Sequence, residues 1–266
     1  MVKALCGAVL LALFGGARAQ TMPAPPNIAA ASDLKFALDE AAEAFKQQSG
    51  QSLRLSYGSS GNFYAQILQG APFQLFLSAD EDFVFKLAEQ GFSPDRGVLY
   101  GTGRLVLFAP KGSKLKPDAE LADLRLALSD GRVRKFAIAN PAHAPYGRAA
   151  KQALQSAGLW AAISPQLVLG ENVSQAAQFA VSGSTEGGLF AYSLALAPQF
   201  SQAGSFVLIP EAMHSPLRQR MVLTKKAGPV ARDFYTYLQA PAGRAILQRH
   251  GFELPPPSSI SSESSR

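Results

Sequence analysis

The stretch RLSYGSSGNFYAQILQGAPFQLFLSAD, residues 54–80, contains two strand candidates with a helix candidate between them. Residues 54–57 and 75–77 have the short, apolar character of strands, whereas Phe63 and Ile67 have the spacing of one helix face. Two strands that are joined by a helix run parallel to each other in one sheet. The stretch therefore predicts an α/β fold.

The same alternation of strands and helices continues on both sides of this stretch. Upstream, Leu34, Leu38 and Phe45 have helical spacing, and downstream a second β-α-β-α-β series extends over residues 136–191. We predict an α/β protein with two lobes, each a mostly parallel sheet flanked by helices.

Length and composition are those of a folded chain with one or two domains. The 266 residues are 47% hydrophobic and 17% charged, which excludes a wholly disordered protein. The formal net charge is +6, but the basic residues are scattered. The densest cluster, Arg132, Arg134 and Lys135, is more typical of a solvated face than of a nucleic-acid interface, so no nucleic-acid partner is predicted.

Residues 1–19 have the features of a secretory signal peptide. Lys3 precedes an apolar stretch from Ala4 to Phe14, and Ala17 and Ala19 form a small-x-small cleavage site. The apolar stretch is short for a membrane span, which disfavours an uncleaved anchor. The one cysteine of the chain lies within this segment, so the mature chain is predicted to contain no disulfide.

Small, hydroxyl-bearing or amide residues occur at four strand-to-helix junctions. These junctions are residues 31–33, 58–61, 145–147 and 171–174. In α/β sheets ligands bind at the carboxyl ends of the strands, where the N–H groups of helix N-termini can hold an anion. Each junction alone is more typical of helix capping than of ligand binding. Together the four favour an anion-binding cleft.

Three motifs, in their order along the chain, resemble the periplasmic molybdate-binding proteins of ABC transporters. They are AASDL at 30–34, YGSSG at 57–61 and GAPFQLFLSAD at 70–80. The similarity continues through residues 105–110, 139–147, 171–173, 188–192 and 249–252. The resemblance implies a type II periplasmic binding protein fold, in which two crossings join the lobes and a tetrahedral oxyanion binds in the interlobe cleft.

The resemblance also implies domain boundaries. Lobe I is expected to comprise residues 20–104 and 215–256, and lobe II residues 105–214. Residues 257–266 are rich in serine and are predicted to form a disordered tail.

The anion is held, as the resemblance implies, by neutral donors and not by metal-ion ligands. The expected ligand-binding groups are the hydroxyl of Ser32, the N–H of Asp33, the hydroxyl and N–H of Ser60, the N–H groups of Tyr146 and Val173, and the phenol of Tyr192. Some relatives have a hydroxyl residue at the position of Asp33. Because a carboxylate that points at a dianion is repulsive, we predict that the Asp33 side chain turns away to cap its helix or to accept other donors.

The implied function is that of a periplasmic receptor without catalytic activity or cofactor. It would capture molybdate, and also tungstate, and deliver the anion to an inner-membrane ABC permease with its ATPase. A monomer is expected. Sulfate or another small oxyanion remains an alternative ligand. A serine hydrolase that uses Ser60 and His143 is a further alternative, although the G-x-S-x-G spacing of a nucleophile elbow is not met.

Overall fold

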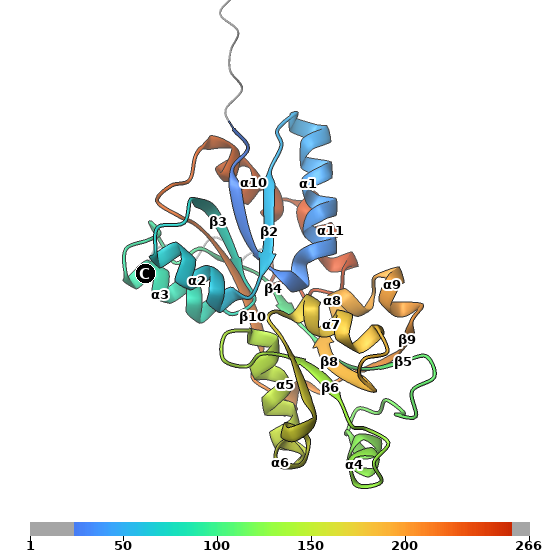
Figure 1. Cartoon of the computed structure of the whole chain (residues 1–266). Coiled ribbons are helices and arrows are strands. Elements are labelled where there is room, and N and C mark those ends of the chain that lie inside the picture. Colours follow the sequence, from blue (N-terminus) through green and yellow to red (C-terminus); the bar gives the residue numbers. More distant parts are fainter. Residues whose placement is uncertain (1–23, 257–266) are drawn as a thin grey trace, which may run out of the picture.

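The strands form two five-stranded sheets, one in each half of the computed structural model, which describes residues 24–256 (Figure 1). We call the halves lobe I and lobe II. The predicted signal peptide and the predicted Ser-rich tail lie outside the described residues. In the part of the chain that is described, no helix is both long and apolar enough to cross a membrane.

The sheet of lobe I has the strand order β2-β1-β3-β10-β4. Its strands are β1 (Asn27–Ala31), β2 (Arg54–Gly58), β3 (Phe73–Ser78), β4 (Val98–Gly103) and β10 (Leu217–Leu223). β1, β2 and β3 are parallel, as the stretch at 54–80 predicts. β10 returns from lobe II and runs antiparallel to β3 and β4.

The sheet of lobe II has the order β7-β6-β8-β5-β9. Its strands are β5 (Leu105–Pro110), β6 (Phe136–Ala139), β7 (Leu167–Gly170), β8 (Gly187–Ala191) and β9 (Gly204–Leu208). β6 is parallel to β7 and β8, whereas β5 is antiparallel to β8 and β9. The two-lobe α/β fold is confirmed, but the sheets are mixed. β5 and β10 enter their sheets directly from the other lobe, so no helical crossover forces them to be parallel.

Helices cover both sheets. In lobe I they are α1 (Lys35–Ser49), α2 (Ser60–Leu68), α3 (Glu81–Glu89), α10 (Pro229–Gln239) and α11 (Pro241–Arg249), with a 3₁₀ turn, η1 (Ser32–Leu34), between β1 and α1. In lobe II they are α4 (Ala122–Ser129), α5 (Pro145–Ser156), α6 (Trp160–Ile163), α7 (Val173–Val181), α8 (Tyr192–Ala195) and α9 (Pro198–Ser201), with the 3₁₀ turns η2 (Ser164–Gln166) and η3 (Glu211–Met213). Gly50 ends α1 in the left-handed region, with φ of 71°.

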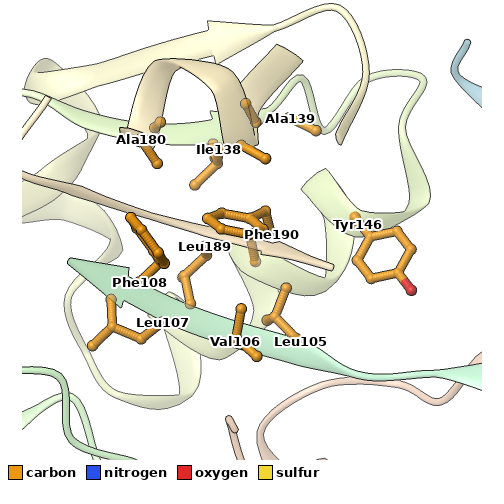
Figure 2. Close-up of a cluster of buried hydrophobic side chains, with 14 of the residues drawn as sticks. Leu105, Val106, Leu107, Phe108, Ile138, Ala139, Tyr146, Ala180, Leu189 and Phe190 are labelled. Carbon is orange, nitrogen blue, oxygen red and sulfur yellow. The ribbon is translucent and has the colours of Figure 1, made fainter. Parts of the chain in front are cut away.

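Each lobe has its own hydrophobic core. In lobe II the rings of Phe108 and Phe190 lie on the neighbouring strands β5 and β8 with centroids 5.3 Å apart (Figure 2). Burial of such a side chain stabilises the fold by about 1.5–3 kcal/mol. Figure 2 also shows the ring of Tyr146 at one end of this cluster, with its hydroxyl pointing away from the aliphatic side chains. That hydroxyl reaches the boundary between the lobes.

Candidate functional site

A small pocket lies where the two lobes meet. Loops at the carboxyl ends of β1, β2 and β3 line it from lobe I, and the starts of α5 and α7 line it from lobe II. The lining residues are Ala31, Ser32, Asp33, Gly58, Ser59, Ser60, Ala79, Ala144, Pro145, Tyr146 and Val173. The pocket is therefore at the carboxyl edges of parallel strands, where the sequence predicts a ligand.

Three helices direct their N-termini at this pocket. α2 begins at Ser60, α5 at Pro145 and α7 at Val173. The first turn of each helix has N–H groups without partners inside the helix, and the helix dipole adds roughly half a positive charge there. Side chains satisfy some of these groups, since Ser59 accepts from the N–H of Asn62 at 3.3 Å. The remaining N–H groups favour an anion.

Five of the six predicted ligand-binding residues line the pocket. They are Ser32, Asp33, Ser60, Tyr146 and Val173. None of the lining residues is a lysine or an arginine, and Asp33 is the one acidic residue among them. An anion in this pocket would thus be bound by dipoles and hydroxyl groups and not by a cation.

Tyr192 is the one predicted ligand-binding residue that is not among the residues lining this pocket. It begins α8 and is half-buried, and its ring packs against that of Phe206 with centroids 5.9 Å apart. A Cβ atom built on Gly251 would lie only 2.8 Å from the Tyr192 ring, so the ring also covers this glycine closely. The ring of Tyr192 is thus packed on two sides, and the contact of its phenol with the anion stays a prediction.

The hydroxyl groups of Ser32 and Ser60 are each oriented by a hydrogen bond that the hydroxyl oxygen accepts. The Ser60 hydroxyl oxygen accepts from the N–H of Ala79 at 3.0 Å, and Ser60 is fully buried. The Ser32 hydroxyl oxygen accepts from the N–H of Ser174 at 3.2 Å. A hydroxyl group has one hydrogen and two lone pairs, so each of these can still donate to an oxyanion.

The Asp33 carboxylate points into the protein, where it accepts a side-chain amide. Its Oδ2 atom accepts from Nε2 of Gln219 at 2.6 Å, and the same Nε2 donates to the Tyr146 hydroxyl oxygen at 3.2 Å. The Tyr100 hydroxyl donates to Oε1 of Gln219 at 2.6 Å. The prediction that Asp33 accepts other donors is confirmed.

Burial controls the ionisation of this cluster. Desolvation raises the pKa of Asp33 from 3.8 to about 6, and the hydrogen bonds from Gln219 and Tyr146 offset only part of that effect. Desolvation also raises the pKa of Tyr100 and of Tyr146, and the nearby Asp33 charge adds to both. Both phenols therefore remain protonated donors at neutral pH.

Sequence reasoning missed Gln219 and Tyr100. Gln219 is a fully buried polar residue in the strand LRQRMVL, residues 217–223. An amide in a central strand is a signal for a buried polar network, because burial of an unpaired amide is costly. Tyr100 gives no such signal, since tyrosine is common in strands.

His143 contacts Ser59 and not Ser60, which disagrees with the pair expected for a serine hydrolase. Its Nδ1 atom lies 2.9 Å from the Ser59 hydroxyl oxygen, and its Nε2 atom lies 3.6 Å from Oε2 of the exposed Glu171. The loop that precedes α5 directs the imidazole to the residue that caps α2. The chain thus uses His143 to join the lobes.

Further contacts between the lobes surround the pocket. The N–H of Gly61 donates to the carbonyl oxygen of His143 at 3.0 Å, and the Ser193 hydroxyl donates to the carbonyl oxygen of Asp33 at 2.8 Å. Arg148 forms an ion pair with Asp80. These contacts hold the lobes together in the described structure. Across residues 24–256, no group of three or more His, Cys, Asp or Glu side chains is arranged to hold a metal ion.

Comparison with known proteins agrees with this geometry. Residues 26–253 match the family described as bacterial extracellular solute-binding protein. The molybdate-binding protein ModA of Rhodobacter capsulatus is 32% identical over 92% of this chain and 95% of its own length, and that of Azotobacter vinelandii is 33% identical over 86% and 89%. The solved periplasmic molybdate-binding protein of Azotobacter vinelandii is 31% identical and superposes with a TM-score of 0.79 over 87% of this chain and 100% of that chain. The sulfate-binding protein SubI of Mycobacterium tuberculosis, at 14% identity and a TM-score of 0.71, shares the fold.

Proposed function

The chain belongs to the bacterial extracellular solute-binding proteins, and we propose that it is a periplasmic receptor that captures molybdate for an ABC transporter. It binds its anion between the lobes and gives it to an inner-membrane permease, which an ATPase drives. The predicted export signal at residues 1–19 supports secretion to the periplasm. The hydroxyl and N–H groups of the pocket suit the binding of an anion without catalysis.

One observation carries this proposal. The interlobe pocket combines three helix N-termini with two oriented hydroxyls and has no lysine or arginine in its lining. A fully deprotonated oxyanion accepts from all of these donors, so every dipole is satisfied. Closure of the lobes removes water from around the anion, which strengthens each of these hydrogen bonds.

We assign the anion contacts to five residues. The hydroxyls of Ser32 and Ser60 and the N–H groups of Asp33, Tyr146 and Val173 would bind the oxygen atoms of the oxyanion. These residues come from both lobes, so an anion that binds all of them favours the closed arrangement. We leave the Tyr192 phenol out of this assignment because Tyr192 is not among the residues that line the pocket.

The proposal is tested by a ligand panel on the mature chain, residues 20–266. Sodium molybdate, tungstate, sulfate and phosphate are each titrated by calorimetry and added in thermal-shift assays. Molybdate and tungstate are expected to bind and to raise the unfolding temperature, because a ligand that binds the folded state stabilises it. A preference for sulfate would mean that the protein is a receptor for that alternative anion. Binding of none of the four anions would refute the proposal.

The contact between His143 and Ser59 is the one observation that favours a hydrolase. Its test is the turnover of a chromogenic ester by the mature chain. The Ser59 hydroxyl already accepts from the N–H of Asn62 and caps α2, so we expect no turnover. Hydrolysis that disappears in Ser59→Ala would reverse this expectation.

A further inference from the structure

Asp33 places both its N–H group and its carboxylate at the interlobe pocket. As one of the residues that line the pocket, it is assigned an N–H contact with the anion, and the residue is 1% exposed. The carboxylate accepts from the Gln219 amide at Oδ2, and the neutral Tyr146 hydroxyl is its other side-chain donor. Oδ1 is buried and has no hydrogen-bond partner among the described residues. The site therefore holds a poorly compensated carboxylate next to the position of the anion.

Within residues 24–256, the hydrogen bonds and ion pairs of the nearby cations are made with groups other than this carboxylate. On α1 Lys35 is paired with Asp39, on α5 Arg148 is paired with Asp80, and on β10 Arg218 and Arg220 are paired with Glu81. Further titratable groups on the elements around it include Tyr57 on β2, Tyr100 on β4, Tyr146 on α5 and Tyr192 on α8, with His143 and Glu171 in the loops before α5 and α7. The side chains that donate to the Asp33 carboxylate, those of Gln219 and Tyr146, are neutral.

A doubly charged anion in this pocket would repel the Asp33 carboxylate. Inside a closed site the dielectric constant is low. The Asp33 carboxylate and an anion bound to the N–H group of the same residue therefore repel each other strongly. Protonation of the carboxyl removes that repulsion, and the lone pairs of Oδ1 are available for the proton. In the ligand-free protein burial already raises the pKa of Asp33 to about 6, so protonation at neutral pH needs little free energy.

Resting on the proposed function, we propose that the site takes up one proton on the Asp33 carboxyl when it captures a doubly charged oxyanion. The bound complex then has one negative charge fewer than a dianion beside an ionised carboxylate. No covalent bond to the anion forms. The proton comes from solvent and returns to it when the anion leaves.

The direction of the pH dependence follows from linkage. Below about pH 6 the carboxyl of the free protein is already protonated, so binding takes up no further proton. Above that pH each captured dianion must bring a proton with it, and the dissociation constant rises by up to about tenfold per pH unit. The affinity for molybdate is therefore expected to be highest in mildly acidic conditions.

Calorimetry measures this proton directly. Sodium molybdate is titrated into the mature chain at pH 7.5 in several buffers that differ in ionisation enthalpy, and the slope of the observed heat gives the number of protons taken up. We expect a value that approaches one for the natural chain. In Asp33→Asn, which keeps an acceptor for Gln219 but cannot ionise, we expect no uptake and an affinity independent of pH.

A second variant separates Asp33 from the histidine nearby. His143→Asn keeps a polar group near Ser59 but cannot titrate, and it should retain the proton uptake. Binding of molybdate without proton uptake by the natural chain would overturn the inference and leave the proposed function intact. Uptake that persists in Asp33→Asn and disappears in His143→Asn would also overturn it. Absence of binding at every pH would refute the proposed function itself.

Discussion

The Ser174 hydroxyl donates a hydrogen bond to the carbonyl oxygen of Ser32 at 2.8 Å, and the N–H of Ser174 donates to the Ser32 hydroxyl oxygen at 3.2 Å. Ser32 belongs to lobe I, whereas Ser174 is in the first turn of α7 in lobe II. The residue assigned to bind the anion is thus also bonded across the cleft. Capture of the anion and closure of the lobes are therefore linked through Ser32.

Ser174→Ala removes one of these two bonds and is expected to weaken molybdate binding. A hydrogen bond of this kind contributes about 0.5–1.5 kcal/mol, so the dissociation constant should rise about 2- to 10-fold. Calorimetry measures the change. Ser182→Ala, at the other end of α7, is the matched control, because the Ser182 hydroxyl bonds to the carbonyl oxygen of Phe179 within lobe II. Equal affinities of the Ser174 variant and the natural chain would show that this bond does not stabilise the closed form.

Gly61→Ala tests the closure of the lobes by a steric route. A Cβ atom on Gly61 would lie 2.6 Å from the carbonyl oxygen of His143 in the other lobe. Because this neighbour is backbone, the lobes must separate to accommodate the methyl group. We expect a clear loss of molybdate affinity, with little change in the unfolding temperature of the ligand-free protein.

A second glycine provides the control for the change at residue 61. At Gly228 a Cβ atom would meet only the end of the Gln74 side chain, at 3.3 Å. Gly228→Ala should therefore leave the affinity unchanged. If Gly61→Ala bound molybdate as tightly as the natural chain, the close contact between the lobes would not be needed for binding.

The sequence predicted more of the site than of its surroundings. The hydroxyl at Ser60 and the N-terminus at Val173 could be placed because they follow strands in a regular α/β pattern. The pairing of His143 with Ser59 could not be predicted, since it depends on how far the lobes close. Gln219 is distant in sequence from Asp33, and only the return of β10 into the first sheet brings their side chains together.

Tyr192 illustrates what a motif leaves open. The residue occurs in a motif that resembles the family, but whether its ring enters the cleft depends on packing against Phe206 and Gly251, which lie far from it along the chain. A motif fixes the position of a residue at the end of a strand. It does not fix the direction of a long side chain there, which tertiary packing decides.

Ser60→Ala should weaken molybdate binding by about 1–3 kcal/mol, because a buried anion oxygen loses its donor. The change also leaves the N–H of Ala79 without its acceptor, so the ligand-free protein should be less stable. Calorimetry and thermal unfolding measure the two effects separately.

Ser93→Ala separates the loss of stability from the loss of affinity. Ser93 is 5% exposed, and its hydroxyl donates to the carbonyl oxygen of Asp95 outside the pocket lining. This control should lose stability without any change in affinity. A similar loss of affinity in both variants would mean that Ser60 acts through the fold and not through the anion.

Tyr192→Phe is expected to leave molybdate affinity unchanged. The Tyr192 ring is not part of the pocket lining, and phenylalanine preserves its packing against Phe206. The comparison is with Ser60→Ala under the same conditions. A weakening of tenfold or more in Tyr192→Phe would show that the phenol reaches the anion, and would restore the contact that the family resemblance implies.

Asp33→Asn should stabilise the ligand-free protein at neutral pH. The pKa of Asp33 is raised from 3.8 to about 6 in the folded state by desolvation, so the folded chain binds more protons than the unfolded chain between these values. The stability associated with this carboxyl is present below pH 3.8 and is lost as the pH rises to about 6. Above that pH the natural chain is less stable than the variant by up to about 3 kcal/mol. Urea unfolding at pH 4 and pH 7.5 measures the difference, with the exposed Asp82→Asn as the control. The contrary result is that the free energies of unfolding of the natural chain and of Asp33→Asn change in parallel with pH. The Asp33 carboxyl would then ionise in the folded protein as it does in the unfolded chain, so burial would not destabilise its charged form.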